Sequence, residues 1–232
     1  MANLRVFKLK NPYRLDQEIK QTVHISGSDC ILDYSKSPWV AMDTEYLSFN
    51  TLLDKLCTIQ IASKAEPDSD EIRVEILFVY DEQPGEKLKE LLNNENIEKI
   101  FHVFSSDMPR IENFAQTRIK GKIFDTKVAA KIAWTNSQSH GMKRLLKMFI
   151  DPNFEQKETE LMADFEIGPD NWSDNQIYYM MQDVLYLDAL KQKIMKMADR
   201  RGKLELVKEV MTMLPVVSEL YKKGYSESVL GY

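Results

Sequence analysis

The sequence predicts an α/β protein in which a mixed five-stranded sheet is flanked by helices and followed by a helical C-terminal extension. Three strand-like runs with short connections come first and indicate an antiparallel meander. Strands and helices then alternate, which is typical of parallel strands with helices across the faces of the sheet. Beyond Gly141 the pattern is helical.

The individual elements follow from periodicity and loop signals. Strands are expected over residues 39–46, 56–62, 75–80, 99–103 and 122–125, and a short strand-like run lies near the N-terminus at 5–10. The cluster D-E-Q-P-G that starts at Asp81 marks a loop after the third of the five strands. Helices are expected over 86–94, 106–115, 126–134, about 174–198 and 203–223.

Composition sets limits on the class of protein. The chain has 232 residues, of which 44% are hydrophobic and 29% charged, enough for one sizeable core and a well-solvated surface. The formal net charge of −5 does not by itself indicate nucleic-acid binding. Residues 118–157, however, carry nine Lys or Arg against three acids. This basic segment could guide a nucleic-acid backbone, or it could simply be a set of solvated helix faces.

Cysteine usage and hydropathy predict a cytoplasmic location. Cys30 and Cys57 have no metal-ligand spacing and suggest no disulfide framework, which fits a reducing compartment. No apolar run approaches the roughly 18 residues of a membrane span. The N-terminus lacks the apolar segment of a secretory signal. We therefore expect no membrane association.

Paired carboxylates lie at the end of the first buried strand of the meander. Asp43 and Glu45 are two residues apart on a strand, so both side chains leave the same face. Hard carboxylate oxygens are the ligands that suit Mg²⁺ or Mn²⁺. The pattern D-x-E occurs three times in the chain, but only here does it end a buried apolar strand.

Two further acidic positions lie on predicted helices. Tyr179 and Asp183 are four residues apart and share one helix face, so the phenol could orient or deprotonate a water beside the carboxylate. Asp107 opens the helix that follows a strand, a common ligand position in α/β folds. Each feature alone also has a structural explanation, namely a core tyrosine beside a solvated aspartate, or an acidic residue that favours the helix dipole.

The order of the motifs is more specific than any one of them. D-T-E-Y starts at Asp43, T-I-Q-I at Thr58, H-x-x-x-x-D at His102, D-T-x-x-A at Asp125 and Y-x-x-x-D-x-x-Y-L at Tyr179. In this order the sequence resembles the ribonuclease D branch of the DEDDy 3′-5′ exonucleases, over roughly residues 38–200.

The resemblance implies an RNase H-like fold and the removal of nucleotides from the 3′ end of a single-stranded nucleic acid, RNA rather than DNA. It also implies that two Mg²⁺ or Mn²⁺ ions are bound by four carboxylates and that Tyr179 positions the attacking water. The four expected metal ligands are Asp43, Glu45, Asp107 and Asp183. Expected substrate contacts are Thr44, Leu47, His102 and Lys157, with Phe49 beside them as a residue that could stack on the terminal base. His102 fits a structural hydrogen bond better, and Asp125 fits a helix N-cap better than a role near the metals.

The resemblance also suggests how the chain is divided. We expect an N-terminal arm or edge element at 1–37, the exonuclease domain at 38–200 and a C-terminal helix that packs on it at 201–232, without the HRDC domain that many family members carry. A homodimer through the last helix is possible on the sequence. Two other functions stay open: a 3′-5′ exonuclease on single-stranded DNA, and a catalytically silent scaffold that binds nucleic acid or protein.

Overall fold

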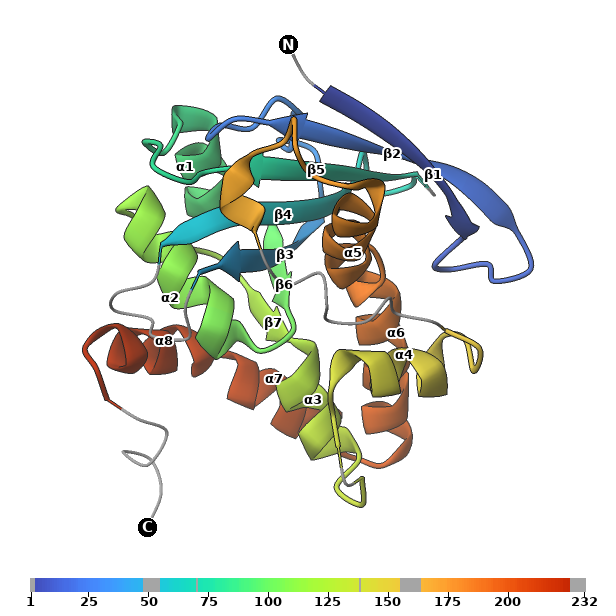
Figure 1. Ribbon diagram of the computed structural model, residues 1–232. Helices are drawn as coiled ribbons and strands as arrows, with labels where there is room; N and C mark the ends of the chain where they lie inside the picture. Colours follow the sequence, from blue (N-terminus) through green and yellow to red (C-terminus); the bar gives the residue numbers. More distant parts are fainter. Residues whose placement is uncertain (1–2, 48–54, 70, 138, 155–163, 226–232) are drawn as a thin grey trace.

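One mixed sheet of seven strands organises the computed structural model, which describes residues 3–47, 55–69, 71–137, 139–154 and 164–225. The strands lie in the spatial order β1-β2-β5-β4-β3-β6-β7 (Figure 1). In chain order they are β1 (Asn3–Lys10), β2 (Glu18–Ser26), β3 (Trp39–Tyr46), β4 (Leu56–Lys64), β5 (Ile72–Phe78), β6 (Glu98–Phe101) and β7 (Ile123–Asp125).

The predicted meander and the predicted parallel strands are both present. β3, β4 and β5 pair antiparallel, while β6 pairs parallel to β3 and β7 parallel to β6. The centre of the sheet is buried on both faces, as the unexposed side chains of Val40, Ile59 and Ile76 show. Because β3, β6 and β7 are parallel, their carboxyl ends meet at one edge, where the polar residues after each strand are brought together.

The N-terminal region forms two strands rather than the single strand-like run expected at residues 5–10. β1 and β2 make an antiparallel hairpin with Lys10 opposite Glu18, and β2 pairs parallel with β5. The sheet therefore has seven strands, with the five expected ones at β3 to β7. The signal for β2 lies in the period-2 spacing of Ile19, Val23 and Ile25, but polar residues at the intervening positions and at Gln21 obscure it.

The helices follow the predicted pattern with shifts of a residue or two at their ends. They are α1 (Glu86–Asn93), α2 (Phe104–Ala115), α3 (Thr126–Ala133), α4 (Met142–Phe149), α5 (Asp174–Leu185), α6 (Leu187–Arg200), α7 (Leu204–Met211) and α8 (Leu214–Lys222), with a short 3-10 helix η2 (Phe165–Ile167). The two long helices expected at 174–198 and 203–223 are each divided. Pro215 explains the second division, because a residue without an N–H group fits the first turn of a new helix.

Helix packing connects the C-terminal part of the chain to the sheet. α5 contacts β3, β4 and β5, and its start is held by a capping box between Ser173 and Gln176. α8 packs on α2, where the buried Glu112 carboxylate lies 2.8 Å from the ammonium of Lys222. Figure 1 shows α7 and α8 running below the sheet. No helix among the described residues is long and apolar enough to cross a membrane.

Candidate active site

Three carboxylates from two elements meet beside the end of β3. Asp43 and Glu45 lie on β3, and Asp183 comes from α5, which packs against that strand. One oxygen from each of the three carboxylates can be chosen so that all three lie within 4.8 Å of one another. Two positions on one strand face and one on a helix that crosses it therefore converge, as the spacing of the motifs predicted.

Asp107 reaches the same region from the first turn of α2. It is 3% exposed, and the hydroxyl of Thr44 donates a 2.6 Å hydrogen bond to its Oδ1. Thr44 stands between Asp43 and Glu45 in the sequence, so this bond ties α2 directly to the strand that carries the other two carboxylates. The fourth residue of the predicted set thus lies beside the cluster, although its oxygens are not among the three that come within 4.8 Å.

Burial raises the pKa values of three of these carboxyl groups, and neighbouring carboxylates raise two of the three further. Burial raises the pKa of Glu45 well above its usual range, and three neighbouring carboxylates raise it further. Burial and the charge of Asp43 likewise raise the pKa of Asp107, although the Thr44 hydroxyl and the nearby Arg110 lower it somewhat. Burial also raises the pKa of Asp43. Negative charge is therefore poorly compensated by the protein here, a condition that a bound cation would relieve.

Tyr179 lies one turn before Asp183 on α5, as the spacing of four residues predicted. The residue is partly exposed. Burial, the charge of Asp183 and a hydrogen bond with that carboxylate raise the pKa of the phenol. The hydroxyl is therefore protonated at neutral pH, which suits orientation of a water better than removal of its proton.

The residues expected to contact substrate differ in their surroundings. The hydroxyl of Thr44 is engaged with Asp107. Leu47 is 46% exposed just beyond the cluster, so it is accessible to a bound nucleotide. Nδ1 of His102 lies 2.8 Å from the hydroxyl of Thr126, and burial lowers the pKa of His102 to about 3, which favours the structural interpretation. Lys157 and Phe49 lie outside the described residues.

Asp125 is the N-cap of α3, as expected, and it has a second role that its sequence spacing does not indicate. Its Oδ1 accepts a 2.7 Å hydrogen bond from the backbone N–H of Val128, and its Oδ2 accepts one of 2.6 Å from that of Phe104. Phe104 begins α2, so one buried carboxylate fixes the starts of two helices. Local spacing indicates only the first contact, because the second joins residues 21 positions apart.

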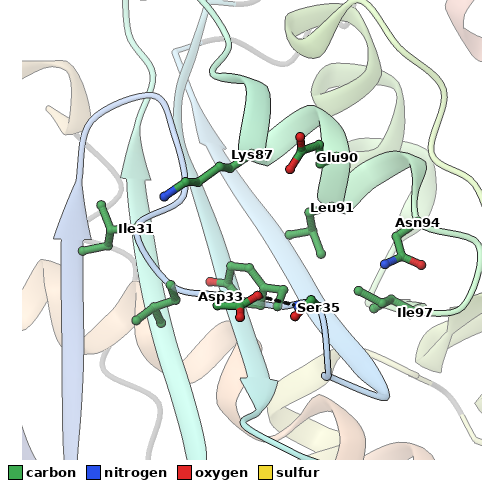
Figure 2. Close-up of a pocket in the computed structure, with 10 residues that line it drawn as sticks. Ile31, Asp33, Ser35, Lys87, Glu90, Leu91, Asn94 and Ile97 are labelled. Carbon is green, nitrogen blue, oxygen red and sulfur yellow. Dashed lines mark hydrogen bonds between the residues drawn. The ribbon is translucent and has the colours of Figure 1, made fainter.

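A separate hollow lies away from the carboxylates. A cavity of about 340 Å³ opens between α1 and the loop that joins β2 to β3 (Figure 2). Figure 2 shows Lys87 and Glu90 of α1 facing Asp33 and Ser35 of the loop, where the Ser35 N–H donates a 2.9 Å hydrogen bond to Asp33. None of the predicted catalytic residues lines this cavity.

The mixed sheet and the cluster of carboxylates fit the class of 3′-5′ exonucleases, and comparison with known proteins shows the family. A family model described as 3′-5′ exonuclease matches residues 24–199, and the chain belongs to this family. The predicted resemblance to ribonuclease D and the predicted RNase H-like architecture are confirmed.

Several curated relatives of the chain are named ribonuclease D. Ribonuclease D of Jannaschia sp. (strain CCS1) is 27% identical over 177 residues, which are 76% of this chain and 44% of that protein. The chain thus spans less than half the length of this curated relative. Brucella melitensis NrnC is 27% identical with a TM-score of 0.79, covering 90% of this chain and 98% of the other, and it has also been solved with bound Mg²⁺ and with bound pGG. The structure of Escherichia coli RNase D has a TM-score of 0.62 at 19% identity, covering 78% of this chain and 45% of that one, and shares the fold.

Proposed function

We propose that the chain is a divalent-metal-dependent 3′-5′ exoribonuclease that trims the 3′ end of RNA. The observation that supports this most directly is the meeting of Asp43, Glu45 and Asp183 within 4.8 Å, with Asp107 beside them. Every member of this donor set offers hard oxygen, as Mg²⁺ and Mn²⁺ require. The raised carboxyl pKa values of Glu45 and Asp107 fit a site built to hold cations.

Asp43, Glu45, Asp107 and Asp183 would hold two divalent ions. When bound, such ions activate a water at neutral pH and stabilise the leaving 3′-oxygen. Tyr179 is proposed to orient the attacking water through its hydroxyl, which projects from the same helix as Asp183. Thr44 keeps the Asp107 carboxylate in one orientation through its 2.6 Å hydrogen bond. Leu47, exposed next to the cluster, is proposed to contact the terminal nucleotide, and Lys157 is proposed to meet a phosphate.

RNA is proposed as the substrate because of the relatives. The curated relatives are named ribonuclease D, and NrnC has been solved bound to pGG. An exonuclease on single-stranded DNA would use the same carboxylates and differ only in contacts to the 2′-hydroxyl. A silent scaffold fits less well, because the carboxylates of the predicted set are present and close together.

The test is digestion of 5′-labelled single-stranded RNA, its DNA analogue and pGG, each with Mg²⁺, Mn²⁺ or EDTA. The parent protein should give a metal-dependent ladder that shrinks from the 3′ end of the RNA, and Asp183→Ala should give none. Faster cleavage of the DNA would favour the DNA alternative. A folded parent protein that cleaves nothing with either metal would contradict the proposal and favour the scaffold.

A further inference from the structure

The first turn of α2, which carries Asp107, has a weakened backbone. Val103 precedes the helix with φ of 74°, a left-handed conformation that is unfavourable for a β-branched residue. Pro109 lies inside the helix, so it has no N–H to donate to the carbonyl of Ser105 one turn earlier. The helix ladder alone therefore holds Asp107 less firmly than an ordinary first turn would.

Arg110 reinforces this turn from one position beyond the proline. Its side chain is buried, with 5% of the residue exposed. Nη1 donates hydrogen bonds to the backbone carbonyl of Ser106 and, at 3.0 Å, to its Oγ. Ser106 is the immediate neighbour of Asp107, so the guanidinium fixes the segment that presents this carboxylate.

The same guanidinium contacts the strand that carries Glu45. The central carbon of Arg110 lies 3.5 Å from the centroid of the Tyr46 ring, and the Tyr46 hydroxyl is 3.2 Å from Oγ of Ser106. Tyr46 follows Glu45 directly, at the point where the pairing of β3 with β4 shifts register. Regular strand pairing is interrupted there, so side-chain contacts have a larger share in placing the end of β3.

From this geometry we propose that Arg110 is a positioning residue, which joins Tyr46 to Ser106 and so sets the separation of Glu45 and Asp107. The inference rests on the proposed function, since it assigns these two carboxylates to the metal site. A guanidinium can stack its plane on a ring while its N–H groups reach a carbonyl and a hydroxyl. A lysine ammonium keeps the charge but lacks the plane, so Arg110→Lys separates geometry from charge.

The experiment compares Arg110→Lys and Tyr46→Leu with a matched control. Arg73 makes a similar contact elsewhere in the sheet, since it lies over the ring of Tyr34 at 5.8 Å and donates to the carbonyl of Asp33 at 2.8 Å. Arg73→Lys therefore tests for the general effect of losing an arginine–tyrosine contact. For each variant, Mn²⁺ affinity is measured by titration calorimetry, kcat and KM on RNA by single-nucleotide release, and folding by thermal denaturation.

Arg110→Lys and Tyr46→Leu are each expected to weaken Mn²⁺ affinity and to lower kcat by about tenfold or more, as loss of groups that orient metal ligands does. KM for RNA should change little, and Arg73→Lys should leave the Mn²⁺ affinity and kcat close to those of the parent protein. Unchanged Mn²⁺ affinity in both test variants would overturn the inference. So would a rise in KM alone, which would make Arg110 a substrate contact. Because Mn²⁺ affinity is measured without RNA, failure of this inference is distinguishable from failure of the proposed exoribonuclease activity.

Discussion

The single buried carboxylate of Glu75 and the cluster of carboxylates at the end of β3 differ in the partners that surround them. Glu75 of β5 is completely buried and accepts hydrogen bonds from the hydroxyls of Ser26 (2.9 Å) and Tyr34 (2.7 Å) and from the backbone N–H groups of Ile31 (2.7 Å) and Leu32 (3.4 Å). The cluster at the end of β3 instead brings several carboxylates against one another.

The difference shows which of the two sites is structural. The carboxyl oxygens of Glu75 accept hydrogen bonds from neutral donors at the end of β2 and in the loop after it, so this side chain anchors the loop to the sheet. Glu45 and Asp107 have raised pKa values because burial and like charges act together. A charge that the protein leaves uncompensated points to a ligand that compensates it. The comparison predicts that equivalent amide substitutions have opposite effects on stability at the two places.

The largest expected effect on stability is at Glu75. Glu75→Gln places an amide N–H₂ among groups that donate, and it should lower the free energy of unfolding by about 3 kcal/mol, in the range for hydrogen bonds to charged groups. Tyr34→Phe, which removes one of the donors, should cost about 1 kcal/mol. Urea denaturation in EDTA measures both changes. A Glu75→Gln protein as stable as the parent would show that the loop is held by other contacts.

Asp43→Asn should increase the free energy of unfolding in the same urea assay, opposite to the effect of Glu75→Gln. A raised carboxyl pKa means that the folded state keeps its proton longer than the unfolded chain, so stability is lost as pH rises through that range. Removing the charge should therefore raise the free energy of unfolding of the metal-free protein near pH 7.5, by about 1 kcal/mol or more. If Asp43→Asn instead destabilised the metal-free protein, the carboxylate would have compensating partners in solution.

Metal binding should offset the loss of stability that the buried, like-charged carboxylates of the cluster cause. Mn²⁺ at about 100 times its dissociation constant should stabilise the folded state by about 2.7 kcal/mol. For a chain of this size that corresponds to a rise of roughly 5–10 °C in Tm. Differential scanning fluorimetry of the parent protein and of Asp183→Asn provides the measurement. An equal rise in Tm in both proteins would show that the ion binds elsewhere. As a control, Glu75→Gln should show the same Mn²⁺-dependent rise in Tm as the parent protein if it folds.

The sequence predicted the carboxylate cluster well because its members obey local rules. Period 2 on β3 places Asp43 and Glu45 on one face, and a spacing of four on α5 places Tyr179 beside Asp183. The order of the motifs then indicated that the separate pairs belong to one site. The meander and the parallel strands followed from periodicity in the same way.

The parts that escaped prediction depend on contacts between residues far apart in the chain. The bond from Phe104 to Asp125 and the stacking of Arg110 on Tyr46 have no periodic signature, because they join different elements. β2 was missed because its pairing with β5 is nonlocal and its outward positions are polar. The division of the chain into a region at 1–37, a domain at 38–200 and a C-terminal part remains a prediction.

The last prediction concerns His102, whose effect on the pH dependence of stability is opposite to that of the carboxylates. Burial lowers its pKa to about 3, so the unfolded chain binds the proton first as pH falls below about 6.5. On account of this residue, the free energy of unfolding should therefore fall by about 1.6 kcal/mol between pH 6.5 and pH 5. The carboxylates with raised pKa values should instead increase the free energy of unfolding over the same fall in pH. His102→Asn retains a polar partner for the Thr126 hydroxyl and should remove only the contribution of the imidazole. The variant should therefore become more stable relative to the parent protein as pH falls. If the free energies of unfolding of the two proteins changed with pH in parallel, His102 would take up its proton as readily in the folded state as in the unfolded chain. Its structural assignment would then have to be replaced by one in which the charged imidazole has a partner.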